Sequence, residues 1–268
     1  MDLTALDAAA IAGLVRAGEV SATDVTRAHL ERAERLGVGV GAFARLTGEL
    51  ALSQAAAVDA AVADGSATGE LLGVPCPIKD LNPVAGVGFE AGSAALAGNV
   101  ADVDDDIVTW FRGAGTVMLG KTSTPEFGLP CYTESEVGPP ARTPWDLRRS
   151  AGGSSGGAAA AVASGLAPIA HASDGGGSIR IPASVCGLVG LKASRGRISP
   201  GSFREPGPGL AIDGVLTRTV TDTAIALDVL AGRGVGEPYG APAPLTSFAE
   251  AVRRAPGRLR VGVLTQPT

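Results

Sequence analysis

Residues that bind metals or form disulfides are scarce in this sequence of 268 residues. Its three cysteines, Cys76, Cys131 and Cys186, are widely spaced and form no C-x-x-C pair. Only two histidines occur, and His171 lies in the apolar run Pro168–Ala172. This pattern argues against a zinc site and predicts reduced thiols. We expect no cofactor, and we expect His171 to be a hydrogen-bonded core residue rather than a catalytic base.

Long apolar runs and clusters of basic residues are also absent. Glycine, serine or charged residues interrupt every apolar run, so no segment is predicted to span a membrane. The first residues, M-D-L-T, lack the basic region of a secretory signal. The net charge is −5, and Lys and Arg are not clustered, so nothing predicts a nucleic-acid surface. We therefore expect a cytoplasmic protein without nucleic-acid or membrane partners.

Glycine and proline are plentiful, with 39 and 18 residues, but they are spread among apolar runs, as in a folded chain. Helix patterns occupy Thr4–Ala17, Ser21–Leu36, Glu49–Ala63, Asp102–Ala114, Ala158–Ala163 and Thr221–Ala231. Strand patterns occupy Ala42–Leu46, Val117–Leu119, Pro168–Ala172, Gly187–Leu191 and Leu259–Leu264. This alternation predicts an α/β fold with a mostly parallel mixed sheet covered by helices on both faces. We expect a helical region at 1–65 and a catalytic core at 66–268.

Two serines stand in glycine-rich loops, Ser154 in G-G-S-S-G-G and Ser178 in D-G-G-G-S-I-R-I-P. Glycine permits backbone conformations with positive φ and a close approach to the main chain. A serine in such a loop can present a nucleophilic hydroxyl beside free N–H groups, which acyl transfer requires. A flexible linker would also be rich in glycine and serine, but the Ala158–Ala163 run between the loops favours a helix.

These two loops, with Pro77-Ile78-Lys79-Asp80 upstream, resemble the signature of the amidase signature family. The similarity extends through Gly120–Thr122 and Gly187–Lys192 and covers nearly the whole chain. The resemblance implies hydrolysis of a linear carboxamide C–N bond by a Ser-Ser-Lys triad, through an acyl-enzyme. The expected partner is a small-molecule amide.

In that family the nucleophile falls at Ser178, the bridging serine at Ser154 and the base at Lys79. The resemblance also implies a cis peptide bond before Ser154. Lysine is usually exposed, but a buried lysine is readily neutral and can then accept a proton. The candidate oxyanion hole consists of the backbone N–H groups of Gly175, Gly176, Gly177 and Ser178.

A loop at 128–138 corresponds to one that lines the substrate pocket in the family, so Cys131, Thr133 and Ser154 are candidate substrate-binding residues. Asp174 and Arg180 are expected to be structural, with Asp174 bracing the loop and Arg180 pairing with a carboxylate.

Three other interpretations compete with an amidase. Gly115–Thr122 matches the phosphate-loop pattern G-x-x-x-x-G-K-[ST], but its middle residues are typical of a strand and no helix follows, so we reject nucleotide binding. A glutamine-dependent amidotransferase component is the second; such relatives usually carry glutamine where this chain has Ile181. A non-catalytic scaffold is the third, and reaction of Ser178 with a fluorophosphonate probe would exclude it.

Proteins that this chain resembles run much further, and the predicted strand Leu259–Leu264 has no helix after it to cover it. We therefore expect an N-terminal portion of a larger amidase domain. Alone it would be poorly active and prone to aggregate. A homo-oligomer, or a partner chain that supplies the remainder, stays open.

Overall fold

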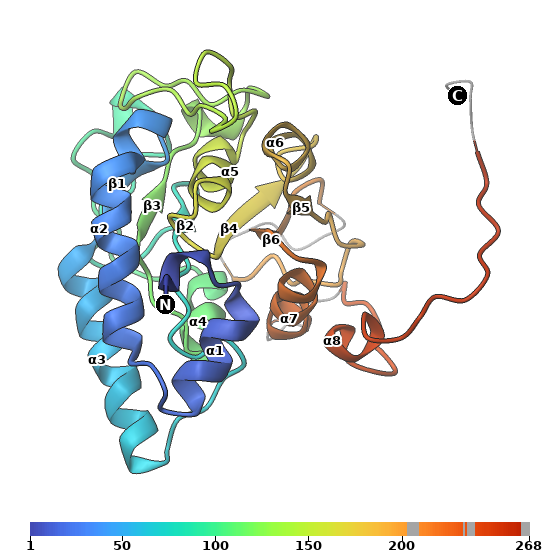
Figure 1. The fold of residues 1–268 in the computed structure, drawn as a ribbon. Helices are drawn as coiled ribbons and strands as arrows, with labels where there is room; N and C mark the ends of the chain where they lie inside the picture. Colours follow the sequence, from blue (N-terminus) through green and yellow to red (C-terminus); the bar gives the residue numbers. More distant parts are fainter. Residues whose placement is uncertain (203–208, 233, 235–238, 264–268) are drawn as a thin grey trace.

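The computed structural model describes residues 1–202, 209–232, 234 and 239–263 (Figure 1). Its α-helices are α1 (Ala8–Arg16), α2 (Ala22–Val40), α3 (Gly48–Asp64), α4 (Asp106–Gly113), α5 (Gly156–Ala163), α6 (Arg180–Cys186), α7 (Val220–Leu230) and α8 (Phe248–Ala251). Its strands are β1 (Phe43–Leu46), β2 (Ile78–Lys79), β3 (Gly120–Thr122), β4 (Ile169–Asp174), β5 (Val189–Gly190) and β6 (Ile212–Thr217). Short 3-10 turns lie at Leu3–Ala5, Ala94–Leu96 and Glu126–Gly128.

The N-terminal helices form as their sequence signals predict. Ser21 Oγ accepts a hydrogen bond from Asp24 N at 2.9 Å, which caps α2 at its start. Gly41 and Gly65 end α2 and α3 in the left-handed conformation that glycine adopts most readily. The two helices lie side by side along one edge of the molecule (Figure 1). No helix among the described residues is both long and apolar enough to cross a bilayer.

The strands form two small sheets, ordered β1-β3-β2 and β4-β6-β5. Among the described strand pairs only β2 and β3 run parallel, so the predicted mostly parallel sheet is not confirmed. The helix–strand alternation does produce a crossover, because β4 and β5, joined through α6, run in the same direction. However, β6 comes later in the chain and inserts between them, antiparallel to both. Alternation alone could not reveal this insertion.

Several predicted strand bounds are wrong. The strand expected at Val117–Leu119 begins instead at Gly120, and Val117 forms only an isolated bridge with Pro75. Residues 259–263 are exposed and belong to no strand, while Leu264 lies outside the described residues. No other part of the described chain covers 259–263, so an apolar run alone does not make a strand there. Strand β6 and helix α8 were not predicted.

Helix α5 lies between the two sheets and is buried over most of its length (Figure 1). Its alanines and Val162 pack with Ala170 and Ala172 of β4 in one apolar cluster. On the side away from β4, the first turn of α5 contacts the backbone at Ser123. Gly157 N donates a hydrogen bond to Ser123 O there at 3.1 Å. Small residues are therefore required where the helix approaches the chain at Ala42 and Ser123.

Substitution of Gly157 by alanine is expected to destabilise the fold. A Cβ there would lie 2.3 Å from Ser123 N and 2.6 Å from Ala42 O, and backbone atoms cannot move aside cheaply. Overpacking of this kind costs about 1–3 kcal/mol or more. Gly13→Ala in α1 is the matched control, since no described atom beyond the neighbouring helix backbone lies within 4 Å of its Cβ position, and it should be neutral or stabilising. Urea denaturation followed by circular dichroism measures both; equal midpoints for the two variants would contradict the prediction.

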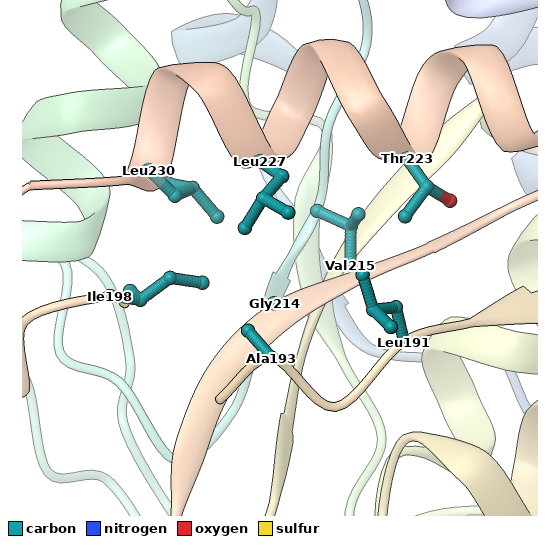
Figure 2. Close-up of a pocket in the computed structure, with 8 residues that line it drawn as sticks. All are labelled: Leu191, Ala193, Ile198, Gly214, Val215, Thr223, Leu227 and Leu230. Carbon is teal, nitrogen blue, oxygen red and sulfur yellow. The ribbon is translucent and has the colours of Figure 1, made fainter. Parts of the chain in front are cut away.

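Helix α7 packs on β6 through an apolar layer (Figure 2). Figure 2 shows Leu227 and Leu230 of the helix facing Val215 of the strand and Ile198 of the segment before it. The space left between them is about 10 Å³, roughly the room for a single water. This layer is therefore core rather than a ligand site.

The same helix holds the N-terminal segment in place. Asp222 accepts hydrogen bonds from Ala8 N at 3.2 Å and Ala9 N at 2.9 Å, so it satisfies amides in the first turn of α1. Burial raises the pKa of Asp222, and these hydrogen bonds act in the opposite direction. The guanidinium of Arg218 also donates to Leu6 O. The start of the chain is thus fixed by residues more than 200 positions later.

Candidate active site

Lys79 is the last residue of β2 and is fully buried. Its Nζ lies 2.7 Å from Ser154 Oγ and 3.2 Å from Ser173 Oγ. A lysine side chain in contact with a serine hydroxyl, away from water, is suited to exchange a proton with that hydroxyl once the amine is neutral. The structure therefore brings together two of the three predicted catalytic residues.

Ser154 lies just before α5 and is almost fully buried. The peptide bond between Gly153 and Ser154 is cis, as the resemblance implied. The amide of the next residue, Ser155, donates to Ser178 O at 3.2 Å. This bond joins the two glycine-rich loops, which are distant in the sequence.

One cavity of about 360 Å³ opens beside these loops. Both Ser154 and Ser178 line it, together with Ser173 and Cys131. The other lining residues that the structure describes are glycine, proline or apolar: Leu81, Phe127, Gly128, Leu129, Pro130, Gly153, Gly175, Gly176, Ile181, Leu210 and Ala211. Its volume lies within the usual range for small-molecule sites.

Ser178 sits between β4 and α6 and is half-buried. No hydrogen bond joins Ser178 Oγ to Ser154 Oγ among the described residues. Ser178 and Ser154 thus both line the cavity, and the hydroxyl of Ser154 also contacts Lys79. Contacts between catalytic groups commonly tighten only when substrate binds.

Asp174, the last residue of β4, fixes the conformation of the Ser178 loop. Its carboxylate accepts hydrogen bonds from Gly177 N at 2.7 Å and Ile179 N at 3.2 Å. Arg180 pairs with it through Nε at 2.9 Å and a second guanidinium nitrogen at 3.0 Å. Burial raises the pKa of Asp174, but the hydrogen bonds from Arg180 and the loop amides outweigh burial and hold that pKa well below its ordinary value. The predicted bracing roles of Asp174 and Arg180 are confirmed.

The predicted oxyanion donors divide into two groups. The N–H of Gly177 is engaged by Asp174, so it is not available to a substrate in this conformation. The N–H groups of Gly175, Gly176 and Ser178 donate to no other described residue. Lys192 Nζ donates to Gly175 O at 2.6 Å and to Leu210 O at 3.0 Å, which holds the peptide unit that carries the N–H of Gly176. The structure thus favours three of the four amides.

The two pocket residues predicted from the 128–138 loop lie in different places. Cys131 is exposed and lines the cavity. Thr133 is buried behind the loop, where its hydroxyl donates to Gly152 O at 2.9 Å and accepts from Gly156 N at 3.1 Å. Thr133 thus supports the backbone that carries Ser154 and does not reach the cavity.

Cys131 is expected to be the thiol that reacts with iodoacetamide in the folded protein. Burial raises the pKa of Cys76 to about 12 and that of Cys186 to about 11, so only about one thiol in 10³ or fewer is ionised at pH 8 at those two positions. Peptide mass mapping after brief alkylation would show the modified residue. Alkylated protein should also react more slowly with a fluorophosphonate, whereas Cys131→Ser should be indifferent to iodoacetamide. Modification of Cys76 as fast as Cys131 would contradict this.

His171 is confirmed as a satisfied core residue. Its Nε2 lies 3.1 Å from Asp213 Oδ1, and its Nδ1 accepts the backbone N–H of Lys79 at 3.2 Å. The His–Asp pair resembles part of a serine hydrolase triad, but the nitrogen that would face a serine is occupied by this amide. A Ser-His-Asp arrangement is therefore not formed.

Ser173 was missed by sequence reasoning. It is the neighbour of Asp174 at the end of β4, and its hydroxyl contacts Lys79 Nζ. The sequence signal that could have identified Ser173 is its place directly before the glycine-rich loop that begins at Asp174. The apolar lining residues carried no signal, because they come from separate loops that are distant in the sequence.

The phosphate-loop match at 115–122 is part of the core. Its lysine, Lys121, is fully buried in β3, 2.8 Å from Asp80 Oδ1, and donates to Asn82 O at 2.8 Å. Burial lowers the pKa of Lys121, and Asp80 opposes this change. Only the last three residues of the match, Gly120–Thr122, thus lie in a buried strand, and the amine of Lys121 is held there by Asp80 and Asn82.

The chain is similar to amidases in both sequence and fold. The family model described as Amidase matches residues 24–268, and the chain belongs to that family. A solved structure of a 6-aminohexanoate cyclic dimer hydrolase superposes with a TM-score of 0.89 at 41% identity, over 99% of this chain and 54% of that one.

Two curated relatives are similar in sequence over nearly all of this chain. The 6-aminohexanoate-cyclic-dimer hydrolase of Paenarthrobacter ureafaciens is 42% identical, over 97% of this chain and 52% of its own length. A glutamyl-tRNA(Gln) amidotransferase subunit of Salinispora arenicola is 42% identical, over 94% and 51%. The chain thus spans about half the length of the curated relatives it matches.

Proposed function

We propose that this chain carries the catalytic groups of an amide hydrolase that works through a seryl acyl-enzyme. The observation that carries the proposal is the contact of 2.7 Å between Lys79 Nζ and Ser154 Oγ beside a cavity that Ser178 also lines. A buried amine beside a buried hydroxyl, next to a second, accessible hydroxyl, has the order of groups that a proton relay requires.

In the proposed reaction Lys79 is neutral and accepts the proton of Ser154, which takes the proton of Ser178 as Ser178 Oγ bonds to the carbonyl carbon. The carbonyl oxygen becomes an oxyanion, and the amides of Gly175, Gly176 and Ser178 are the donors that we propose for it. The C–N bond then breaks as Ser154 gives a proton to the leaving nitrogen and takes back the proton held by Lys79, which is neutral again. Water cleaves the acyl ester, which releases the acid and restores the hydroxyl of Ser178.

The cavity lining favours a neutral, apolar acyl group. No charged side chain lines the cavity among the described residues, while Leu81, Phe127, Ile181 and Leu210 do. Glutamine carries an ammonium and a carboxylate, and both would be desolvated there without a partner. The second candidate is therefore less well supported, although a relative named as an amidotransferase component is equally similar in sequence.

The test is hydrolysis of primary amides of increasing acyl length, compared with glutamine, in the presence of hydroxylamine. An acyl-enzyme should yield the hydroxamate together with the acid, and kcat/KM should rise with acyl length. Glutamine as the preferred substrate would favour the amidotransferase interpretation instead. Failure of Ser178 to react with a fluorophosphonate would favour a scaffold.

A further inference from the structure

His171 is a fully buried residue that the proposed proton relay does not use. It lies in β4, two residues before Ser173, and its ring packs edge-on against Phe111 with a centroid distance of 6.0 Å. Both ring nitrogens have partners, on two different strands. Such a residue can determine where those strands lie relative to each other.

Strands β2 and β4 belong to different sheets, yet they touch at His171. The backbone N–H of His171 donates to Pro77 O at 3.0 Å, as in a strand ladder. The next bond of this junction is different, because the acceptor for Lys79 N is the imidazole Nδ1 at 3.2 Å. The ring thus takes the place of a backbone carbonyl between the sheets.

The protonation of the ring follows from these contacts. Nδ1 can accept the amide hydrogen of Lys79 only when it carries no proton, so the proton of the neutral imidazole lies on Nε2. There it faces Asp213 Oδ1 at 3.1 Å, on β6. Asp213 therefore selects the tautomer that can bind Lys79, in the way that an outer carboxylate commonly orients a histidine.

Lys79 is consequently fixed at both ends. Its backbone is bound by His171, and its Nζ contacts Ser154 and Ser173. Since His171 and Ser173 lie on the same strand, β4 sets both the position of the lysine backbone and the direction of its side chain. An error of about 1 Å in such a placement can cost about 10² in rate.

We propose that His171, oriented by Asp213, is a positioning residue that sets Lys79 against Ser154. This inference rests on the proposed role of Lys79 as the base. It assigns to His171 no proton transfer with substrate. What it requires is a hydrogen-bond acceptor at the position of Nδ1.

The test compares His171→Leu with His171→Asn, since an asparagine oxygen can replace Nδ1 as the acceptor and leucine cannot. We expect His171→Leu to lower kcat by about 10–100-fold with KM changed less than about threefold, and to slow fluorophosphonate labelling of Ser178 in parallel. His171→Asn should restore kcat to within about threefold of the wild type. A general loss of stability would not be reversed by the acceptor alone.

His29→Leu is the matched control. His29 is the other histidine, it is also buried, and its Nδ1 contacts Val25 O at 2.9 Å, within one helix and outside the cavity lining. Burial lowers its pKa to about 4, so it is neutral at pH 7. Its replacement should leave kcat unchanged.

Two results would overturn the inference: a folded His171→Leu variant with kcat within about twofold of the wild type, or a folded His171→Asn variant that loses more than about tenfold. The second applies even if the leucine variant does not fold. Lys79→Met separates the two hypotheses. If it is inactive while His171→Leu is normal, only the positioning role fails; if it is active, the proposed relay fails as well.

Discussion

Replacement of Ser178 by alanine is expected to abolish amide hydrolysis while the fold stays intact. The variant removes the attacking oxygen, and among the described residues that line the cavity Ser154 and Ser173 both contact Lys79, so neither hydroxyl replaces it. Removing the nucleophile of a catalytic serine unit costs on the order of 10⁶ in kcat. The measurement is turnover of the best amide from the acyl-length series, together with fluorophosphonate labelling, which should disappear.

Ser164→Ala provides a matched control for the serine substitution. Ser164 follows α5, and its buried Oγ has no hydrogen-bond partner among the described residues. Its loss should leave both turnover and labelling unchanged. Activity of Ser178→Ala within about tenfold of the wild type would show that the nucleophile is another residue.

Replacement of Lys79 by methionine is expected to produce the second largest loss of activity. Methionine fills a similar buried volume without the amine, so packing is kept and the proton acceptor is lost. General acid–base groups contribute about 10²–10⁴ in rate, and Lys79→Ala should lose at least as much. In the wild type, activity should rise towards alkaline pH, because protonated Nζ cannot accept the proton of Ser154. The slope of the pH–rate profile should vanish in the residual activity of Lys79→Met.

Lys121→Met separates loss of a base from loss of a buried cation. Lysine occurs only at positions 79, 121 and 192, and Lys121 is as buried as Lys79. Its removal leaves Asp80 buried without its ion-pair partner, which costs about 3–5 kcal/mol of stability. The Lys121 variant should therefore unfold more easily, whereas Lys79→Met should chiefly lose activity. A flat pH–rate profile in the wild type, with Lys79→Met fully active, would contradict the base assignment.

The parts of the site that were predictable from sequence are those fixed by local chemistry. The glycine-rich sequences around Ser154 and Ser178 predict turns. Asp174 directly precedes the second turn, so its carboxylate was expected to accept hydrogen bonds from the amides of that turn. The contact of Lys79 with Ser154 was available only through a family resemblance, since 75 residues separate them. Nothing local tells a buried lysine from an exposed one.

The rest depended on contacts between distant segments. Gly177 was predicted as an oxyanion donor because three glycines stand in a row and the sequence does not distinguish them. Only the geometry of the turn directs the N–H of Gly177 towards Asp174. Strand β6 was missed because glycine interrupts its apolar pattern, at Gly214, where the side chain of Ile179 packs closely. Tertiary packing outweighed the local pattern in both places.

The dependence of α1 on Asp222 has a consequence for biosynthesis. The carboxylate that completes the first turn of this helix lies 214 residues after Ala8. At about 5–20 residues per second, a ribosome needs about 10–40 s to cover that distance. During this interval the apolar face of the nascent helix, with Ile11 and Val15, has no finished site to pack into. A chaperone that holds the emerging N-terminus would therefore act on this protein before Asp222 has been synthesised.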